Sequence, residues 1–175
     1  MYEEIPEEHC LTLVRGISAP EFLTRIGAEP GETGVCWEDL LPELWPQEET
    51  DENIAVAELD GWILGFECIG SLGVNPSVYG PLSAGTELVS HFQNVNHVAD
   101  FVWVQDGVRR LGFDPVHLRV SRGEPLPVFE ELKRIGFHID DADDEVPFSL
   151  AEHLTGIDVT AELLTTLDFH IGTVR

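Results

Sequence analysis

Two Asp-Gly dipeptides, at residues 60–61 and 106–107, constrain the fold of this chain more than any other feature. Each lies between two runs in which apolar residues alternate with other residues. Alternation of this kind is typical of β-strands, and Asp-Gly supplies the positive φ angles of a tight type I′ turn. The sequence therefore predicts two β-hairpins, formed by residues 54–59 with 62–69 and by residues 98–105 with 108–113.

A further strand is predicted between the hairpins, at residues 86–93, where the turn Asn94–Asn96 leads into the second hairpin. The connector before it, residues 70–85, includes a short helix at residues 76–82. Five strands at spacings of about ten residues, joined mainly by short turns, are typical of an antiparallel meander. We therefore expect a five-stranded β-meander spanning about residues 54–113.

Helices are predicted before and after this sheet in the sequence. Ser18 and Glu21 have the spacing of a capping box, and Gly27 suits a left-handed cap, so a two-turn helix lies between them, preceded by a short strand at residues 10–14. Apolar residues at helical spacing and Thr160 as a cap predict three later helices, at residues 125–135, 148–155 and 161–167. The predicted fold is a single α+β domain, residues 1–175, in which helices from both terminal segments cover the sheet.

Two acidic segments carry no clear periodicity. Residues 28–53 are rich in Pro and Gly, with one helix-like patch at residues 37–41, and residues 138–147 include the run Asp140–Glu145. We interpret both as acidic surface loops. A loop as long as the first is uncommon in a compact domain unless it binds a partner.

The net charge of −24 is distributed unevenly. Residues 1–60 carry sixteen acids against two bases, residues 61–123 five against four, and residues 124–175 twelve against three. Such a surface repels phosphate backbones and anionic lipid and favours basic partners. We therefore expect a basic protein partner, and neither direct nucleic-acid binding nor membrane binding. Only one of the nine bases is lysine, so a compositional bias of the source genome is an alternative cause of the acidity.

The cysteines and the N-terminal residues indicate a reducing compartment. Cys10, Cys36 and Cys68 are an odd number at wide spacings, which fits neither a disulfide framework nor a zinc ribbon. The first residues lack the basic and apolar regions of a secretory signal, and no apolar run is long enough to span a membrane. A soluble cytoplasmic protein is expected.

Enzyme signatures are absent from the sequence. Residues 70–73 do not form a GxSxG elbow, and the chain contains no P-loop and no GxGxxG. Its seven histidines include no HxH pair and no HExxH, and the Asp140–Glu145 run lacks the pattern of a calcium loop. We predict no catalytic residues, no metal and no cofactor, and favour a non-enzymatic protein.

The first functional hypothesis is an acidic protein-binding module that engages a basic partner, such as a toxin, a nuclease or another nucleic-acid-binding protein, through the segment 28–53. Trp45 is an aromatic residue of the kind that anchors interfaces, although it could also fold back onto the core. The predicted partner-binding residues are Glu43, Trp45, Glu48, Glu49, Asp51 and Glu52.

Two alternatives remain open. The densest polar cluster could form a small-molecule or enzyme site, in which His91 exchanges a proton and Gln93 orients a ligand. This cluster comprises Ser90, His91, Gln93, Asn94 and Asn96. Packing of His91 and turn formation by the asparagines would explain the same residues without a site. The third hypothesis is a structural subunit of a larger assembly.

The basic residues of the middle segment are Arg109, Arg110, Arg119 and Arg122. They could bind the acidic ends of the same chain, or an acidic segment of a partner.

Several segments resemble a group of uncharacterised, high-GC actinobacterial proteins classed as a domain of unknown function. The resemblance rests on residues 10–16, Gly61-Trp62, 82–86, 89–96, 106–115 and 151–156. It implies no catalytic residues. It is compatible with a bacterial protein of the immunity or antitoxin type, by analogy of fold and composition alone.

Overall fold

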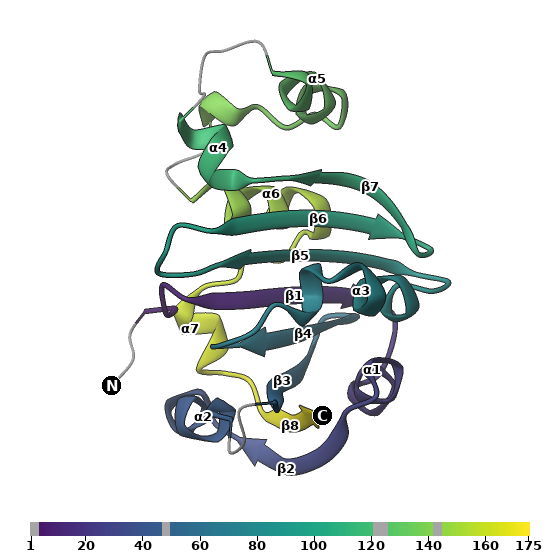
Figure 1. The fold of residues 1–175 in the computed structure, drawn as a ribbon, viewed down its shortest axis with the longest axis vertical. Coiled ribbons are helices and arrows are strands. Elements are labelled where there is room, and N and C mark those ends of the chain that lie inside the picture. Colours follow the sequence, from purple (N-terminus) through teal and green to yellow (C-terminus); the bar gives the residue numbers. More distant parts are fainter. Residues whose placement is uncertain (1–3, 47–49, 121–125, 142–144) are drawn as a thin grey trace.

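The computed structural model describes residues 4–46, 50–120, 126–141 and 145–175. They form an α+β fold built on one antiparallel sheet of eight strands, in the order β2-β8-β3-β4-β1-β5-β6-β7 (Figure 1). The strands are β1 (His9–Arg15), β2 (Glu29–Val35), β3 (Glu52–Leu59), β4 (Trp62–Glu67), β5 (Glu87–Gln93), β6 (Ala99–Gln105), β7 (Val108–Phe113) and β8 (Phe169–Val174).

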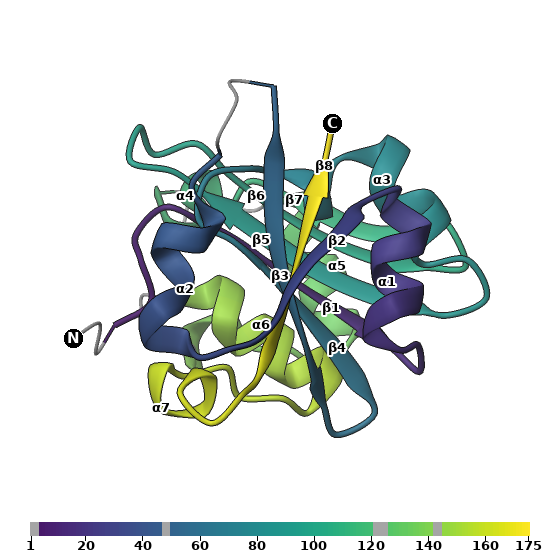
Figure 2. The same cartoon turned by 90° about the horizontal axis from the view of Figure 1, so that it is seen from below.

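Helices cover both faces of the sheet (Figures 1 and 2). One face carries α1 (Ala19–Ile26), the short helix η1 (Leu72–Val74) and α3 (Pro76–Leu82). Along the other face and its β7 end lie α2 (Trp37–Leu44), α4 (Pro115–Val120), α5 (Pro127–Arg134), η2 (Ile139–Asp141), α6 (Val146–Thr155) and α7 (Ala161–Leu164).

The two Asp-Gly hairpins are confirmed. Asp60 and Gly61 have φ of 45° and 82°, and Asp106 and Gly107 have φ of 47° and 74°. These are the left-handed conformations that a type I′ turn requires at both central residues. The turns join β3 to β4 and β6 to β7, and β5 pairs with β6 as predicted.

The prediction of a five-stranded meander is wrong, because the sheet has eight strands and β1 separates the two hairpins. β1 pairs with β4 on one side and with β5 on the other. Six of its seven residues are buried. A strand that is apolar on both faces is most stable in the centre of a sheet, where helices cover both sides.

The prediction of a long loop over residues 28–53 is also wrong, since this segment contains β2 and α2. β2 is an edge strand, exposed at six of its seven residues, so it has no alternation of buried positions to reveal it. α2 contains Pro42, which disfavours a helix in sequence-based reasoning, but burial of Trp37, Leu40 and Leu44 stabilises it. In the second predicted loop, η2 precedes residues 142–144, which lie outside the described part, and α6 begins at Val146.

Helix caps agree with the sequence at several points. The Ser18 hydroxyl accepts the Glu21 N–H at 3.3 Å, and Gly27 ends α1 at φ 71°. The Glu21 carboxylate binds Arg25 at 2.7 Å instead of returning to the cap. Thr160 caps α7 by accepting the Leu163 N–H at 3.1 Å.

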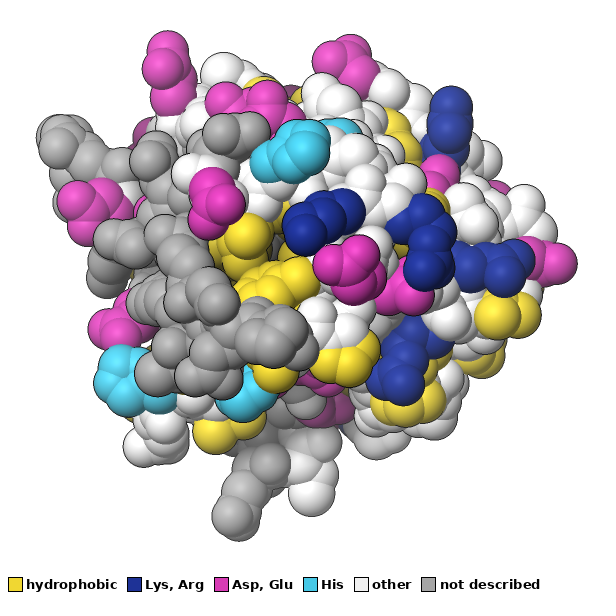
Figure 3. Space-filling view, turned by 90° about the horizontal axis from the view of Figure 1, so that it is seen from above, with side chains coloured by type: hydrophobic (Ala, Val, Ile, Leu, Met, Phe, Trp, Pro, Cys, Tyr) yellow, Lys and Arg dark blue, Asp and Glu magenta, His cyan; other side chains and the backbone are white. Residues whose placement is uncertain are grey.

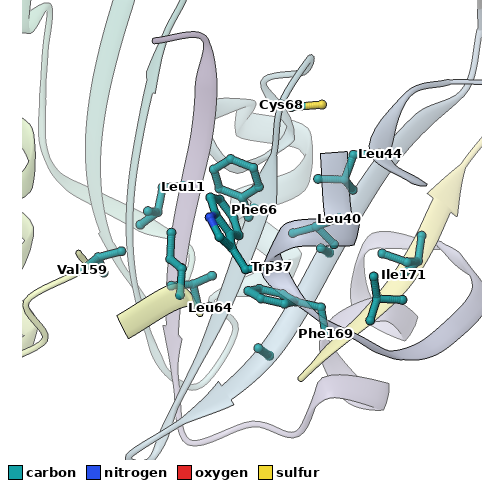
Figure 4. Close-up of a cluster of buried hydrophobic side chains, with 14 of the residues drawn as sticks. Leu11, Trp37, Leu40, Leu44, Leu64, Phe66, Cys68, Val159, Phe169 and Ile171 are labelled. Carbon is teal, nitrogen blue, oxygen red and sulfur yellow. The ribbon is translucent and has the colours of Figure 1, made fainter. Parts of the chain in front are cut away.

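The α2 face of the sheet holds a core built around Trp37 (Figure 4). The centre of its ring lies 5.0 Å from that of Phe66 on β4 and 6.1 Å from that of Phe169 on β8. Leu40 and Leu44, one and two turns further along, are buried in the same cluster. This packing fixes α2 against the sheet and leaves its opposite side to solvent.

Candidate functional site

The candidate site is a groove of about 800 Å³ between the end of α2, the segment before β1 and the end of β4. We call it the Trp45 groove. Its walls are mainly apolar, and three carboxylate residues line it. The lining residues are Glu4, Ile5, Pro6, Glu7, Glu8, Leu41, Pro42, Trp45, Cys68 and Ile69.

Trp45 is the most exposed large apolar side chain of this region, at 62%. It follows α2 directly as its C-cap residue. Because Leu40 and Leu44 of the same helix are buried, Leu41 and Trp45 are left on the groove side. Ile69, which also lines the groove, is 38% exposed. Two large apolar side chains thus lie open to solvent in one concave surface.

Asn53 on β3 holds the end of α2 in place. Its side-chain amide donates to the carbonyl of Glu43 at 3.4 Å and to that of Trp45 at 3.2 Å. Its side-chain oxygen accepts from the Thr173 hydroxyl of β8 at 2.8 Å. Asn53 satisfies carbonyls that a helix end leaves without intrahelical partners. Sequence reasoning missed it, because the end of α2 and the strand β8, which carry its partners, were not predicted.

The other wall is held by two hydrogen bonds to the backbone before β1. Gln93 on β5 donates to the Glu7 carbonyl at 2.8 Å, and His9 Nδ1 donates to the Pro6 carbonyl at 2.7 Å. This wall carries Glu4, Glu7 and Glu8, and none of the described residues that line the groove is basic. The groove therefore combines an apolar surface with a local excess of negative charge.

The predicted partner-binding residues lie in more than one place. Trp45 lines the groove, whereas Glu43 and Asp51 line a separate polar groove of about 730 Å³ beside β8. Asp51 lies 4.0 Å from the guanidinium of Arg175. Glu52 begins β3 opposite Val174, and Glu48 and Glu49 lie outside the described residues. The carboxylates of Glu4, Glu7 and Glu8, which were not predicted, are the ones that share the groove with Trp45.

The alternative cluster does not form one site. Ser90 is fully buried on the α1 face of the sheet, and its hydroxyl lies 2.9 Å from that of Thr12. His91, on the other face, packs with its ring centre 4.6 Å from that of Phe148 and 5.3 Å from that of His9. It is 2% exposed, and burial lowers its pKa well below the usual range. A neutral, enclosed imidazole has no open route to a ligand.

The remaining members of this cluster have structural contacts. Asn94 accepts the backbone N–H groups of Asn96 and Val98 at 3.0 and 3.1 Å, which closes the turn between β5 and β6. Gln93 supports the segment before β1, as described above. The turn itself is as predicted from the sequence.

A buried polar cluster under η1 was not predicted. Glu67 lies directly opposite Cys10 in the β1–β4 pair, and its carboxylate accepts the Leu72 N–H at 3.0 Å. Burial raises the pKa of Glu67 to about 8, against the lowering effects of the Cys10 thiol and the Leu72 N–H. The pKa of Cys10 is raised by burial and by the Glu67 charge. Glu67 and Cys10 are at most 1% exposed, so neither faces a ligand directly.

Neither a metal site nor a membrane-spanning helix is found within the described ranges. No three His, Cys, Asp or Glu side chains among these residues are grouped so that they could hold a metal ion. None of the helices in the described part has the length and apolar character needed to cross a membrane.

Comparison with known proteins identifies the family of the chain. No curated protein and no solved structure matches it. One family model matches residues 1–175 in full, and the resemblance to a domain of unknown function is thereby confirmed. The chain belongs to the family of unknown function DUF6461.

Proposed function

We propose that this protein is a non-enzymatic binding module that engages a basic protein partner through the Trp45 groove. The observation that carries the proposal is the exposure of Trp45 and Ile69 in a concave surface that carboxylates line. Interfaces are commonly anchored by a buried aromatic side chain with polar residues around it. An apolar side chain of the partner would occupy the groove, and its Lys or Arg residues would contact Glu4, Glu7 and Glu8.

The charge of the whole molecule supports the same partner. A net charge of −24 attracts a basic protein at long range and accelerates its association at low salt. The same field disfavours direct binding to nucleic acid. Inhibition of a basic toxin or nuclease, as by an immunity protein or an antitoxin, is one function that these properties would serve.

The experiment is affinity capture with the intact protein as bait, from an extract of the source organism, followed by a binding titration with the recovered partner. Trp45→Asp is compared with Val95→Asp, because Val95 is 57% exposed in the β5–β6 turn, outside the lining of the groove. We expect a basic partner whose affinity falls at least about 30-fold in Trp45→Asp and is unchanged in Val95→Asp. The affinity should also fall between about 0.05 M and about 0.5 M salt.

Two outcomes would contradict the proposal. One is a partner that Trp45→Asp and the native protein bind equally well. The other is an affinity that does not change with salt, because it would show that the carboxylates do not contribute to binding. Near-ultraviolet circular dichroism of both variants verifies that the core around Trp37 is intact.

A further inference from the structure

The β7 edge of the sheet is open to solvent. β7 ends the strand order, and within the described part of the chain no strand pairs with its outer side. Val108 is 53% exposed, and Arg109, Arg110 and Gly112 are also exposed. An edge strand of this kind presents backbone N–H and C=O groups that can pair with another strand.

A groove of about 500 Å³ runs between this edge and α5. It is lined by Arg109, Arg110, Leu111 and Gly112 of β7 and by Pro127, Val128 and Glu131 of α5. Leu111 is buried and Val128 is half-buried in the core cluster at this end of the sheet. An edge strand beside a helix is the arrangement in which an extended peptide adds a strand and inserts alternate side chains against the helix.

The charge of this groove is opposite to that of the molecule. Figure 3 looks onto this end and shows Lys and Arg side chains gathered on it. Lys133 and Arg134 of α5 pair with carboxylates of their own helix, Glu130 and Glu131. Arg109 and Arg110, in contrast, have no ion-pair partner within 4.0 Å among the described residues. Arg109 acts on the Asp100 carboxyl of β6 from a longer distance, where its positive charge opposes the rise in pKa that burial causes. Neither guanidinium group is held in a short ion pair of the described residues, so both can bind carboxylates from outside the chain.

The local backbone places these two arginines side by side. A register shift between Trp103 and Val104 leaves Arg110 as an extra residue in β7. The side chain of Arg109 lies over Gly112, where a Cβ atom would approach its Cδ to 2.9 Å. A bulge of this kind re-aims side chains at a sheet edge.

We propose that the outer edge of β7 binds an extended acidic segment of a partner protein as an additional strand. Carboxylates of the segment contact Arg109 and Arg110, and an apolar side chain contacts Leu111 and Val128. This site is separate from the Trp45 groove and has the opposite charge preference. At about 0.15 M salt the Debye length is about 8 Å, so distant carboxylates of the molecule are screened from a peptide in this groove.

The test measures fluorescence polarisation of a labelled peptide of alternating glutamate and valine at this salt concentration. The double variant Arg109→Ala/Arg110→Ala is compared with Arg15→Ala/Arg175→Ala, which removes the same number of positive charges from exposed sites elsewhere. We expect the first to bind about tenfold more weakly and the second to bind like the native protein. Trp45→Asp should bind the peptide normally, which separates this proposal from the proposed function.

A second peptide tests the strand pairing itself. The same sequence with N-methyl groups at alternate residues retains every carboxylate but loses backbone donors. We expect it not to bind. Equal binding of the methylated peptide would show attraction to charge without strand addition and would overturn the proposal. A dimer in solution that only the Arg109→Ala/Arg110→Ala variant abolishes would also overturn it, because a second copy of this chain would then occupy the edge.

Discussion

Glu67 shows how one residue can make the stability of the fold depend on pH. In the unfolded chain a glutamic acid ionises near pH 4.5, whereas burial raises the pKa of folded Glu67 to about 8. The folded state thus holds a proton that the unfolded state loses as pH rises. The contribution of Glu67 to the free energy of unfolding therefore has its full value below about pH 4.5. It falls progressively up to about pH 8, by at most about 5 kcal/mol.

We expect Glu67→Gln to have a higher free energy of unfolding than the native protein at pH 9, with a difference that shrinks as pH falls toward 5. Glutamine keeps an oxygen for the Leu72 N–H and cannot ionise. Urea unfolding of both proteins across this pH range measures the difference, and the comparison cancels the general charge repulsion of the molecule. A difference independent of pH would refute the assignment.

Gly73 provides a second test at the residue scale, because η1 packs directly on the buried polar cluster. A Cβ atom at Gly73 would collide with the Thr12 and Ser90 hydroxyl groups of β1 and β5. Gly80 of α3 has nothing within 4 Å of the same position. We expect Gly73→Ala to destabilise the fold by several kcal/mol, and Gly80→Ala to be neutral or to stabilise it by up to about 1 kcal/mol. Thermal unfolding measures both variants. Equal shifts of the unfolding temperature in Gly73→Ala and Gly80→Ala would contradict this prediction.

At the scale of elements, the end of α2 depends on Asn53 of β3, the strand that follows it in the chain. Asn53→Ala removes the donors to the Glu43 and Trp45 carbonyls and the acceptor for Thr173. We expect a loss of about 1–3 kcal/mol in the free energy of unfolding, together with weaker partner binding at Trp45. Thr173→Val, which deletes only the bond from β8, should cost less. Equal costs in urea unfolding would show that the contact with α2 contributes nothing.

The elements that could be predicted from the sequence are those that local chemistry determines. The Asp-Gly turns and the caps at Ser18 and Thr160 act within a few residues, so their patterns are visible in the chain. The position of β1 between β4 and β5 depends on pairings with residues more than forty positions away. β2 lacked a pattern because an exposed edge strand has no buried positions to alternate.

The candidate site was predictable only in part, for the same physical reason. Trp45 stood out as a large aromatic residue in an acidic segment, and the structure leaves it exposed. The opposite wall comes from residues 4–8, which reach the groove because Gln93 and His9 bind their backbone. The His9 contact is local, but nothing in the sequence of these residues indicates the contact with Gln93, 86 positions away. Glu67 was hidden likewise, since only the tertiary structure removes it from water.

At the scale of the whole molecule, 33 acidic residues stand against nine basic ones. Basic side chains gather at the β7–α5 end (Figure 3), whereas three carboxylate residues, Glu4, Glu7 and Glu8, line the Trp45 groove. The molecule therefore presents two surfaces of opposite local charge. Under the two proposals made above, one surface binds a basic partner and the other an acidic segment, so the protein would link the two.

Repulsion among the carboxylates should make the fold salt-dependent. Unfolding separates the charges, so screening stabilises the folded state more than the unfolded one. We expect the unfolding temperature to rise by several degrees between about 0.02 M and about 0.5 M NaCl, which corresponds to about 1–2 kcal/mol. Differential scanning calorimetry measures this shift.

MgCl2 at equal ionic strength is the control. Matching unfolding curves indicate general screening, whereas a much larger stabilisation by Mg²⁺ would reveal a specific cation site. An unfolding temperature that falls or stays constant as NaCl is added would mean that repulsion among the carboxylates does not destabilise the folded state.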